Sequence, residues 1–215
     1  MRIVEQRHLR VTGEGRVSAS PDGYVLVAAL NVMAETAADA MTSNAQLTLA
    51  VTRRVRDLGL AETAVRTKDL ALHDWFDHST QRVTARVASH QIEVTVGSVE
   101  QLREVVAAVT AEAGERLQIH GIRSWLADTD TISAEALGLA VAQAQAKADT
   151  LAVAAGVTLG PILSLEEQRG LGGQVVHTGG FRTTASSGPA VVPPMPLTPE
   201  DLSVSASVVV VYALS

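Results

Sequence analysis

Cysteine is absent from the 215 residues, and aromatic side chains make up only 3% of them. The first absence excludes disulfides, thiolate metal sites and cysteine nucleophiles, and it leaves the redox compartment open. The second absence means that valine, leucine and alanine must fill the core, because 47% of the residues are nonetheless hydrophobic. We therefore expect a folded protein that is long enough to bury an aliphatic core without cross-links.

Basic charge and long apolar runs are also lacking. The formal net charge of −6 and the scarcity of aromatics argue against a nucleic-acid partner, which normally meets a basic face with stacking side chains. No run approaches the roughly 20 apolar residues of a membrane-spanning helix. Near the start, Ile3 and Val4 are followed at once by Glu5, so these residues lack the apolar stretch that is typical of a secretory leader. As written, the chain is expected in the cytoplasm, with a periplasmic or secreted location as the alternative if a leader has been removed.

Hydrophobic periodicity predicts an α+β fold. Strands are expected at 9–17, 24–33, 65–75, 83–96, 117–126, 162–167 and 202–214, and helices at 36–58, 99–113 and 132–155. Between residues 24 and 126 the order is strand, helix, strand, strand, helix, strand, which is that of a ferredoxin-like split βαβ core. We predict a single domain over 1–215 with a mixed, mainly antiparallel sheet and about three helices packed on it. A mobile Gly/Pro-rich loop at 170–199 precedes the last strand.

Three local patterns make sharper predictions. Gly13 and Gly15 fall on the apolar side of the first strand, which indicates a bulge or the close approach of another backbone. In the strand 83–96 the apolar residues change parity, which predicts a bulge near 88–90. The last strand is apolar on both sides over 208–211, which implies an additional cover from a helix of this chain or from a neighbouring subunit.

The helix expected at 132–155 is rich in alanine, with Ser133 as a plausible N-cap and Gly156 as its stop. Steps of three and four residues define one face of it, and so many small side chains there predict close packing on a sheet. The residues of that face are Leu137, Val141, Ala144, Ala148, Leu151 and Ala155.

Histidines and carboxylates are densest at residues 73–78, which invites a metal-site hypothesis with His73, Asp77 and His78 as ligands. On an extended strand His73 and Asp77 share a face but lie about 13 Å apart, at about 3.3 Å per residue. Only a tight turn, or help from His90 or His120, would bring such ligands together. A solvated hairpin end is the preferred interpretation, and we predict no bound metal and no cofactor.

Motifs for catalysis are not found. The glycine-rich segment 170–180 lacks the Lys-Ser/Thr of a phosphate-binding loop and no helix follows it. There is no G-x-S-x-G nucleophile elbow and no H-E-x-x-H. Glu166 and Glu167 are adjacent carboxylates, but neighbouring strand residues point to opposite faces. Because no acid, base and nucleophile can be assembled, an enzyme is the least favoured class.

The sequence as a whole resembles the SIMPL domain family, which includes bacterial periplasmic immunogenic proteins and a mammalian kinase-associated adaptor. The matching parts are VTGEGRVSASPD at 11–22, AQAKADTLAVAAGVTLGPILSLEE at 144–167, the proline-rich stretch after it, and SVSASVVVVYAL at 203–214. The resemblance implies an α+β domain that often self-assembles, with roles in envelope or oxidative-stress physiology and no established reaction. Exported family members carry a leader, which this chain lacks as written.

Two function classes remain favoured. The first is a non-enzymatic, self-associating protein whose partner is another copy of itself. The alternative is a small-molecule or peptide binding module, in which the segment 170–199 closes over a site.

Overall fold

The structure is a computed structural model that describes residues 7–77, 81–168 and 200–215. Contacts divide the described residues into two compact units, one formed from parts of 1–20, 126–178 and 200–215 and the other from 21–125. The elements in chain order are β1 (His8–Ala19), β2 (Gly23–Ala34), α1 (Ala37–Arg56), β3 (Val65–Asp77), β4 (Arg82–Val96), α2 (Val99–Ala113), β5 (Leu117–Trp125), α3 (Thr129–Ala155), β6 (Leu159–Glu167) and β7 (Leu202–Leu214).

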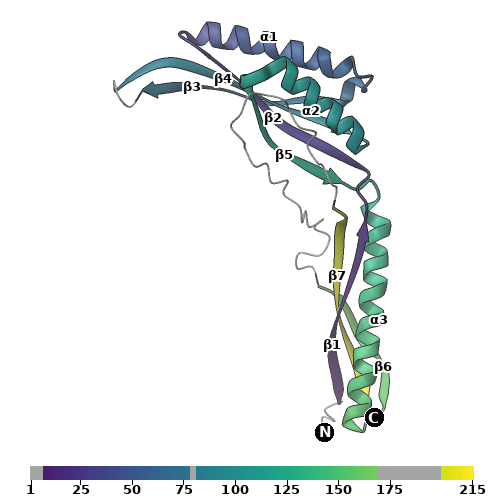
Figure 1. The fold of residues 1–215 in the computed structure, drawn as a ribbon. Coiled ribbons are helices and arrows are strands. Elements are labelled where there is room, and N and C mark those ends of the chain that lie inside the picture. The colour runs from purple at the N-terminus through teal and green to yellow at the C-terminus, as the bar shows by residue number, and fades with distance from the viewer. Residues whose placement is uncertain (1–6, 78–80, 169–199) are drawn as a thin grey trace, which may run out of the picture. The chain divides into compact units, whose positions relative to one another are not determined.

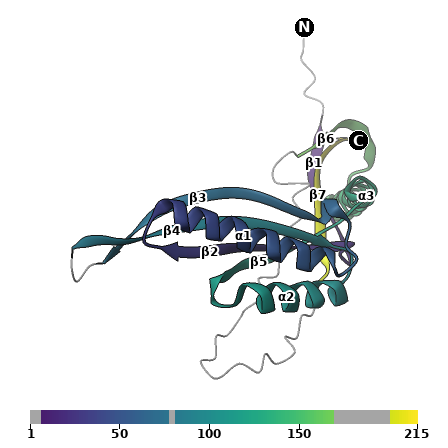
Figure 2. The same cartoon turned by 90° about the horizontal axis from the view of Figure 1, so that it is seen from above.

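The unit 21–125 is a four-stranded antiparallel sheet with two helices on one of its faces (Figures 1 and 2). Its strand order is β3-β4-β2-β5, which is the ferredoxin-like arrangement that the element order predicts. The two helices and every second residue of the central strands β2 and β4 form one core cluster, which includes Leu30, Val51, Ile92 and Val105. The other face of this sheet carries the intervening residues.

The pairing of β4 contradicts the bulge predicted near residues 88–90. The register between β2 and β4 runs without a shift from Tyr24↔Val96 to Ala34↔Arg86, so the bulge expected near 88–90 is wrong. Ala85 and Val87 are buried on one side of the strand and Ile92 and Val94 on the other, so the change of parity reflects burial on both faces. The irregularities lie instead in the β3–β4 pairing, between Thr67 and Leu70 and between Trp75 and Phe76.

The other unit is a three-stranded antiparallel sheet in the order β1-β7-β6, with α3 lying along β1 and β7 (Figure 1). At about 1.5 Å per residue the 27-residue helix is about 40 Å long, which matches a 12-residue strand at about 3.3 Å per residue. The helix can therefore cover the whole of β1. Its buried residues occur at every fourth position: Ala136, Ala140, Ala144, Ala148 and Ala152.

Gly13 and Gly15 allow this helix to lie almost on the backbone of β1. A Cβ on Gly13 would come within 2.7 Å of the backbone nitrogen of Ala144, and one on Gly15 within 2.6 Å of that of Ala140. The close backbone approach that the two glycines predict is thus confirmed, and α3 also supplies cover for Val208 and Val210 of β7.

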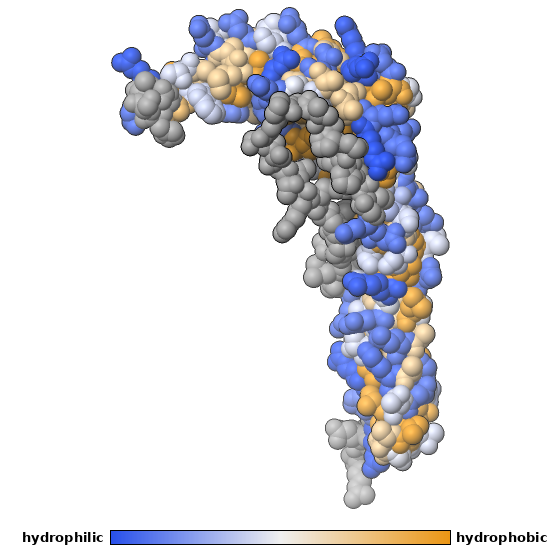
Figure 3. All heavy atoms as spheres, viewed as in Figure 1, coloured by the Kyte–Doolittle hydropathy of each residue, from blue (hydrophilic) through white to orange (hydrophobic). Residues whose placement is uncertain are grey.

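The start and the inner face of α3 differ from expectation. Asp128, not Ser133, is the N-cap, and its carboxylate accepts the backbone N–H of Thr131 at 2.9 Å. Ala144 and Ala148 face the sheet as predicted, whereas Leu151 is 48% exposed. Figure 3 shows hydrophobic residues at the surface of this unit, and the exposed ones on α3 are Leu139, Leu151 and Val153. At the other end Gly156 stops the helix in a left-handed conformation, as predicted.

The predicted α+β class with three helices is confirmed, and the strands of the described residues form two antiparallel sheets. The segment 170–199, with its predicted loop and glycine-rich motif, lies outside the described residues.

Candidate functional site

The histidines of the metal hypothesis do not converge in the part of the chain that the structure describes. His73 is exposed on β3 opposite Val87, whereas His90 lies three residues along β4 from Val87 and therefore on the other face of the sheet. His120 sits on the opposite edge strand, at the register shift between β2 and β5. Across residues 7–77, 81–168 and 200–215, no group of three or more His, Asp or Glu side chains is arranged to hold a metal ion. His78 lies outside those ranges, so a site at His73, Asp77 and His78 stays a prediction.

His90 instead belongs to a polar cluster under α1. Its Nδ1 is 3.2 Å from the hydroxyl of Thr48, which also donates to the carbonyl of Asn44 at 2.9 Å. The Asn44 amide donates to the carbonyls of Leu30 and Ala88 and so ties α1 to β2 and β4. Burial lowers the pKa of His90. These polar side chains are satisfied within the core, which favours a structural role for the histidine.

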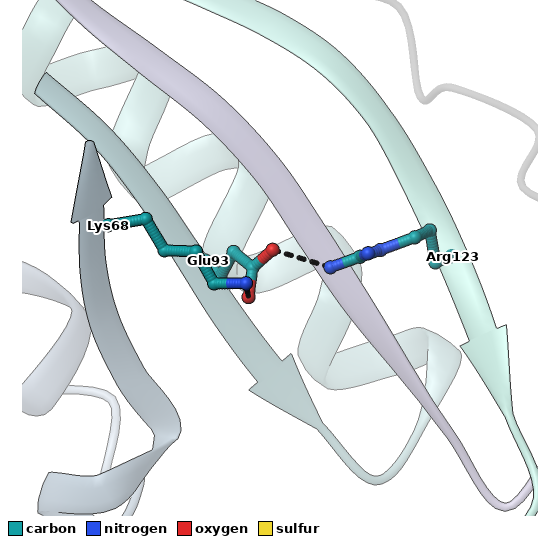
Figure 4. A network of polar contacts seen from close by, with 3 residues as sticks. All are labelled: Lys68, Glu93 and Arg123. Atoms are coloured by element: carbon teal, nitrogen blue, oxygen red, sulfur yellow. Dashed lines mark hydrogen bonds and ion pairs between the residues drawn. The ribbon is translucent and has the colours of Figure 1, made fainter.

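A second polar group lies on the face of this sheet opposite to α1 and α2. Glu93 is only 8% exposed, and its two carboxylate oxygens meet Arg123 at 2.5 Å and Lys68 at 3.3 Å. Figure 4 shows that Arg123 of β5 reaches across β2 to the carboxylate on β4. The two cations lie on strands at the two edges of the sheet, so this ion pair network clamps all four strands together. Glu93 is compensated on both sides, which is expected of a buried charge with a structural role.

The surface with the clearest interaction chemistry is the edge strand β3 together with the part of β4 that pairs with it. Within the described residues no strand pairs with the outer side of β3. Large hydrophobic side chains lie exposed along this hairpin: Leu70, Leu72, Trp75, Phe76 and Val83, each between 41% and 52% exposed. A long edge strand with free backbone groups and exposed apolar side chains is a template for pairing with another strand. We call these five residues with the outer edge of β3 the hairpin edge.

The edge strands of the other unit are protected. On β1, the backbone N–H of Glu14 donates to Gln143 at 2.8 Å, and Lys147 donates to the carbonyl of Thr12 at 3.0 Å. Side chains of α3 therefore occupy the outward hydrogen-bonding groups in the middle of the strand. An open groove of about 620 Å³ follows this seam. On β6, Pro161 removes a donor, but Ile162, Leu163 and Leu165 are 46–50% exposed, so this edge is protected only in part.

The hairpin edge was missed at the level of sequence, although its signal is present there. In the ferredoxin-like strand order the second strand of the motif lies at an edge of the sheet. The predicted strand 65–75 carries Leu70, Ala71 and Leu72 in succession, and an edge strand needs no apolar residues on both faces. The two observations together would have indicated an association surface instead of a metal site.

No helix among the described residues is both long and apolar enough to span a membrane. The family model named SIMPL, described as a protein of unknown function (DUF541), matches residues 9–212. Two similar proteins are the 26 kDa periplasmic immunogenic proteins of Brucella melitensis biotype 1 and Brucella abortus strain S19. Each is 27% identical over 210 residues, which are 94% of this chain and 83% of the relative. A solved hydantoinase/carbamoylase family amidase from Burkholderia ambifaria is 16% identical over 54% of this chain and 29% of its own, and its TM-score of 0.25 supports no argument.

Proposed function

The chain belongs to the SIMPL family, a family of unknown function, and on this premise we propose that it is a non-enzymatic, self-associating protein of the bacterial envelope. The hairpin edge carries the proposal. A second copy of the same chain would cover its apolar side chains and pair its free backbone groups at the same time. Association of this kind needs no reactive group, only matching edges.

The charged side chains of the described residues favour a structural role over a catalytic one. Glu93 is neutralised by Lys68 and Arg123, and Asp74 of β3 pairs with Arg86 of β4 at 3.1 Å. An active site normally keeps such groups poised toward a cavity that holds the substrate. Here the ion pairs join strands of one sheet instead, so they stabilise that sheet.

The location in the envelope rests on the relatives. The two Brucella proteins are named periplasmic, and this favours export of the present chain over the predicted cytoplasmic location. We expect fractionation of the source bacterium by osmotic shock, followed by immunoblotting, to release the protein with the periplasmic fraction. Retention with the cytoplasmic enzymes after complete shock would contradict this part of the proposal.

Light scattering after size-exclusion chromatography tests self-association directly. At micromolar concentration we expect a mass that is a multiple of the 22.5 kDa chain. The paired variant Leu70→Ser with Leu72→Ser removes apolar area from the hairpin edge and is expected to shift the mass toward 22.5 kDa. Val153→Ser is the matched control, because Val153 is 81% exposed on α3, which belongs to the other unit, and its substitution should leave the mass unchanged. A monomeric unsubstituted chain would refute the proposal.

The alternative is a binding module for a small molecule or peptide, and the groove along β1 and α3 is the observation that favours it. Arg10, Lys147 and Thr150 contribute polar atoms to that groove. Lys147 and Gln143 are, however, already bonded to the backbone of β1. A ligand there would have to displace these bonds, so self-association is the better supported of the two functions.

A further inference from the structure

The outer edge of β3 has a sequence that is complementary to itself. Residues 69–73 are Asp69, Leu70, Ala71, Leu72 and His73, and all five are exposed. Read in either direction from Ala71, the order is alanine, leucine and then a polar residue, which is acidic on one side and basic on the other. Two such segments laid antiparallel with Ala71 opposite Ala71 would place leucine against leucine and Asp69 against His73.

The faces of the strand agree with this arrangement. Leu70 and Leu72 pair with His90 and Ala88 of β4, and those two residues lie on the side of the sheet that α1 covers. His73 pairs with Val87 and so lies on the opposite face. Asp69 lies in the irregular stretch between Thr67 and Leu70, where the register with β4 shifts, so its face does not follow from simple alternation. Because residues directly opposite each other in an antiparallel pair share a face, the leucines of two copies meet on one side of the joined sheet.

Neighbouring registers are poorer. If Leu70 were the centre, Lys68 would lie opposite Leu72, and if Leu72 were the centre, Asp74 would lie opposite Leu70. Either register places a charge against an apolar side chain. The segment is also bounded on both sides, since Lys68 is paired with Glu93 beside the β3 irregularity and Asp74 is paired with Arg86. The free, self-complementary part of the edge is therefore 69–73.

We infer that two copies of this chain associate through antiparallel pairing of residues 69–73 of β3 about a two-fold axis at Ala71. This inference rests on the proposed self-association and specifies its contact. Such pairing joins the two four-stranded sheets into one continuous sheet, and the symmetry is that of an isologous dimer contact, in which the same patch serves both subunits. Leu70 of each copy meets Leu72 of the other, and Asp69 of each meets His73 of the other.

Single cysteines test the register, because the chain has none of its own. With Ala71 on the axis, two Ala71→Cys chains bring their Cα atoms within about 4.5–5.5 Å, which a disulfide can bridge. Under mild oxidation of the full chain we expect a covalent dimer. In the same register two Leu70→Cys chains, or two Leu72→Cys chains, place their cysteines on a diagonal about 7–8 Å apart, which is too far. A mixture of the Leu70→Cys and Leu72→Cys chains should cross-link again.

The outcomes separate this inference from the proposed function. Cross-linking that is strongest at Cys introduced for Leu70 or Leu72 alone, or absent from all three single variants while light scattering still shows an oligomer, overturns the register and leaves self-association standing. A monomer by light scattering overturns both. Charge exchange gives an independent readout. Asp69→His and His73→Asp should each weaken association, because each places like residues opposite one another, and the double exchange should restore it. Singles that associate like the unsubstituted chain would overturn the pairing.

Discussion

Replacement of Gly15 by alanine should destabilise the unit that contains α3. An added Cβ at this position would lie 2.6 Å from the backbone nitrogen of Ala140 and nearer still to the carbonyl oxygen of Ala136. Both obstacles are helix backbone, which has no rotamer to change. Since ordinary contact begins near 3.4 Å, the helix must move away from β1 by about 1 Å or more to admit the methyl group.

The size of the effect follows from what that movement breaks. A gap of about 0.5–1 Å removes about a quarter to a half of the dispersion energy between the surfaces on either side of it. Five alanines of α3 are buried against this sheet, and the contacts of Ala136 and Ala140 would be lost first. Overpacking of a core costs typically about 1–3 kcal/mol, and an obstacle made of backbone places Gly15→Ala at or above the upper end of that range.

Gly138→Ala is the matched control, because it makes the same chemical change in α3 itself. A Cβ at Gly138 meets nothing within 4 Å. Alanine is the better helix former in a helix interior, so this variant should gain about 0.5–1 kcal/mol in the free energy of unfolding. Two glycine-to-alanine changes in one packing unit are thus expected to have opposite signs.

Urea denaturation followed by two probes distinguishes the units. Both tryptophans, Trp75 and Trp125, belong to the unit 21–125, so their fluorescence reports its unfolding. Far-UV circular dichroism also follows α3, the longest of the described helices. For Gly15→Ala we expect the dichroism transition to move to lower urea. If this variant were as stable as Gly138→Ala, the helix would not lie on the backbone of β1, and the account of this unit would be wrong.

Three further predictions concern single side chains. Ala148→Leu should overpack the same interface and cost about 1–3 kcal/mol in urea denaturation. Burial lowers the pKa of His90, so below its ordinary pKa of 6.5 the unfolded chain binds more protons than the folded chain. The free energy of unfolding should therefore fall as the pH drops through that value. In tryptophan-monitored melts, His90→Gln should flatten this pH dependence. Arg123→Ala removes the closer partner of Glu93 and should lower the free energy of unfolding by about 1–2 kcal/mol, measured by the same probe. Lys68→Ala should lower it by less than about 1 kcal/mol. Both effects are modest because both cations are half exposed.

Sequence reasoning was strongest where a pattern repeats along an element. The order of strands and helices from 24 to 126 predicted the ferredoxin-like unit, and alternation in β1 placed Gly13 and Gly15 on its inner side. It was weaker where a strand is buried on both of its faces. Val87 and Ile92 are buried on opposite faces of β4, and the change in parity resembles the effect of an inserted residue. Periodicity along one strand does not distinguish the two causes.

The predicted inner face of α3 is right at Ala144 and Ala148, whereas Leu137 and Val141 flank it half-buried and Leu151 is exposed. A helix with a broad inner face shows apolar residues at steps of three and four, which is the pattern that selected Leu137, Val141 and Leu151. This helix lies along a strand instead, where inward residues recur every two positions, at about 6.7 Å. Four helical residues rise about 6.0 Å, so an alanine at every fourth position keeps nearly the same spacing as the inward residues of the strand. Gly15, for example, lies against Ala136 and Ala140. The small side chains correctly predicted packing on a sheet, but periodicity alone did not show how narrow the contact is.

The edges of the two sheets show how selectively this chain protects its strands. β1 has its outward groups bonded by Gln143 and Lys147, and β6 carries Pro161. Such devices prevent a strand from pairing with another molecule. β3 belongs to the same chain, yet Leu70 and Leu72 on it are exposed to solvent. They lie between Asp69 and His73, which would face each other if two copies of the strand paired antiparallel. β6 also exposes Ile162, Leu163 and Leu165, so exposed apolar area alone does not distinguish β3. The order of residues about Ala71, which matches itself, is what favours the use of the β3 edge for association.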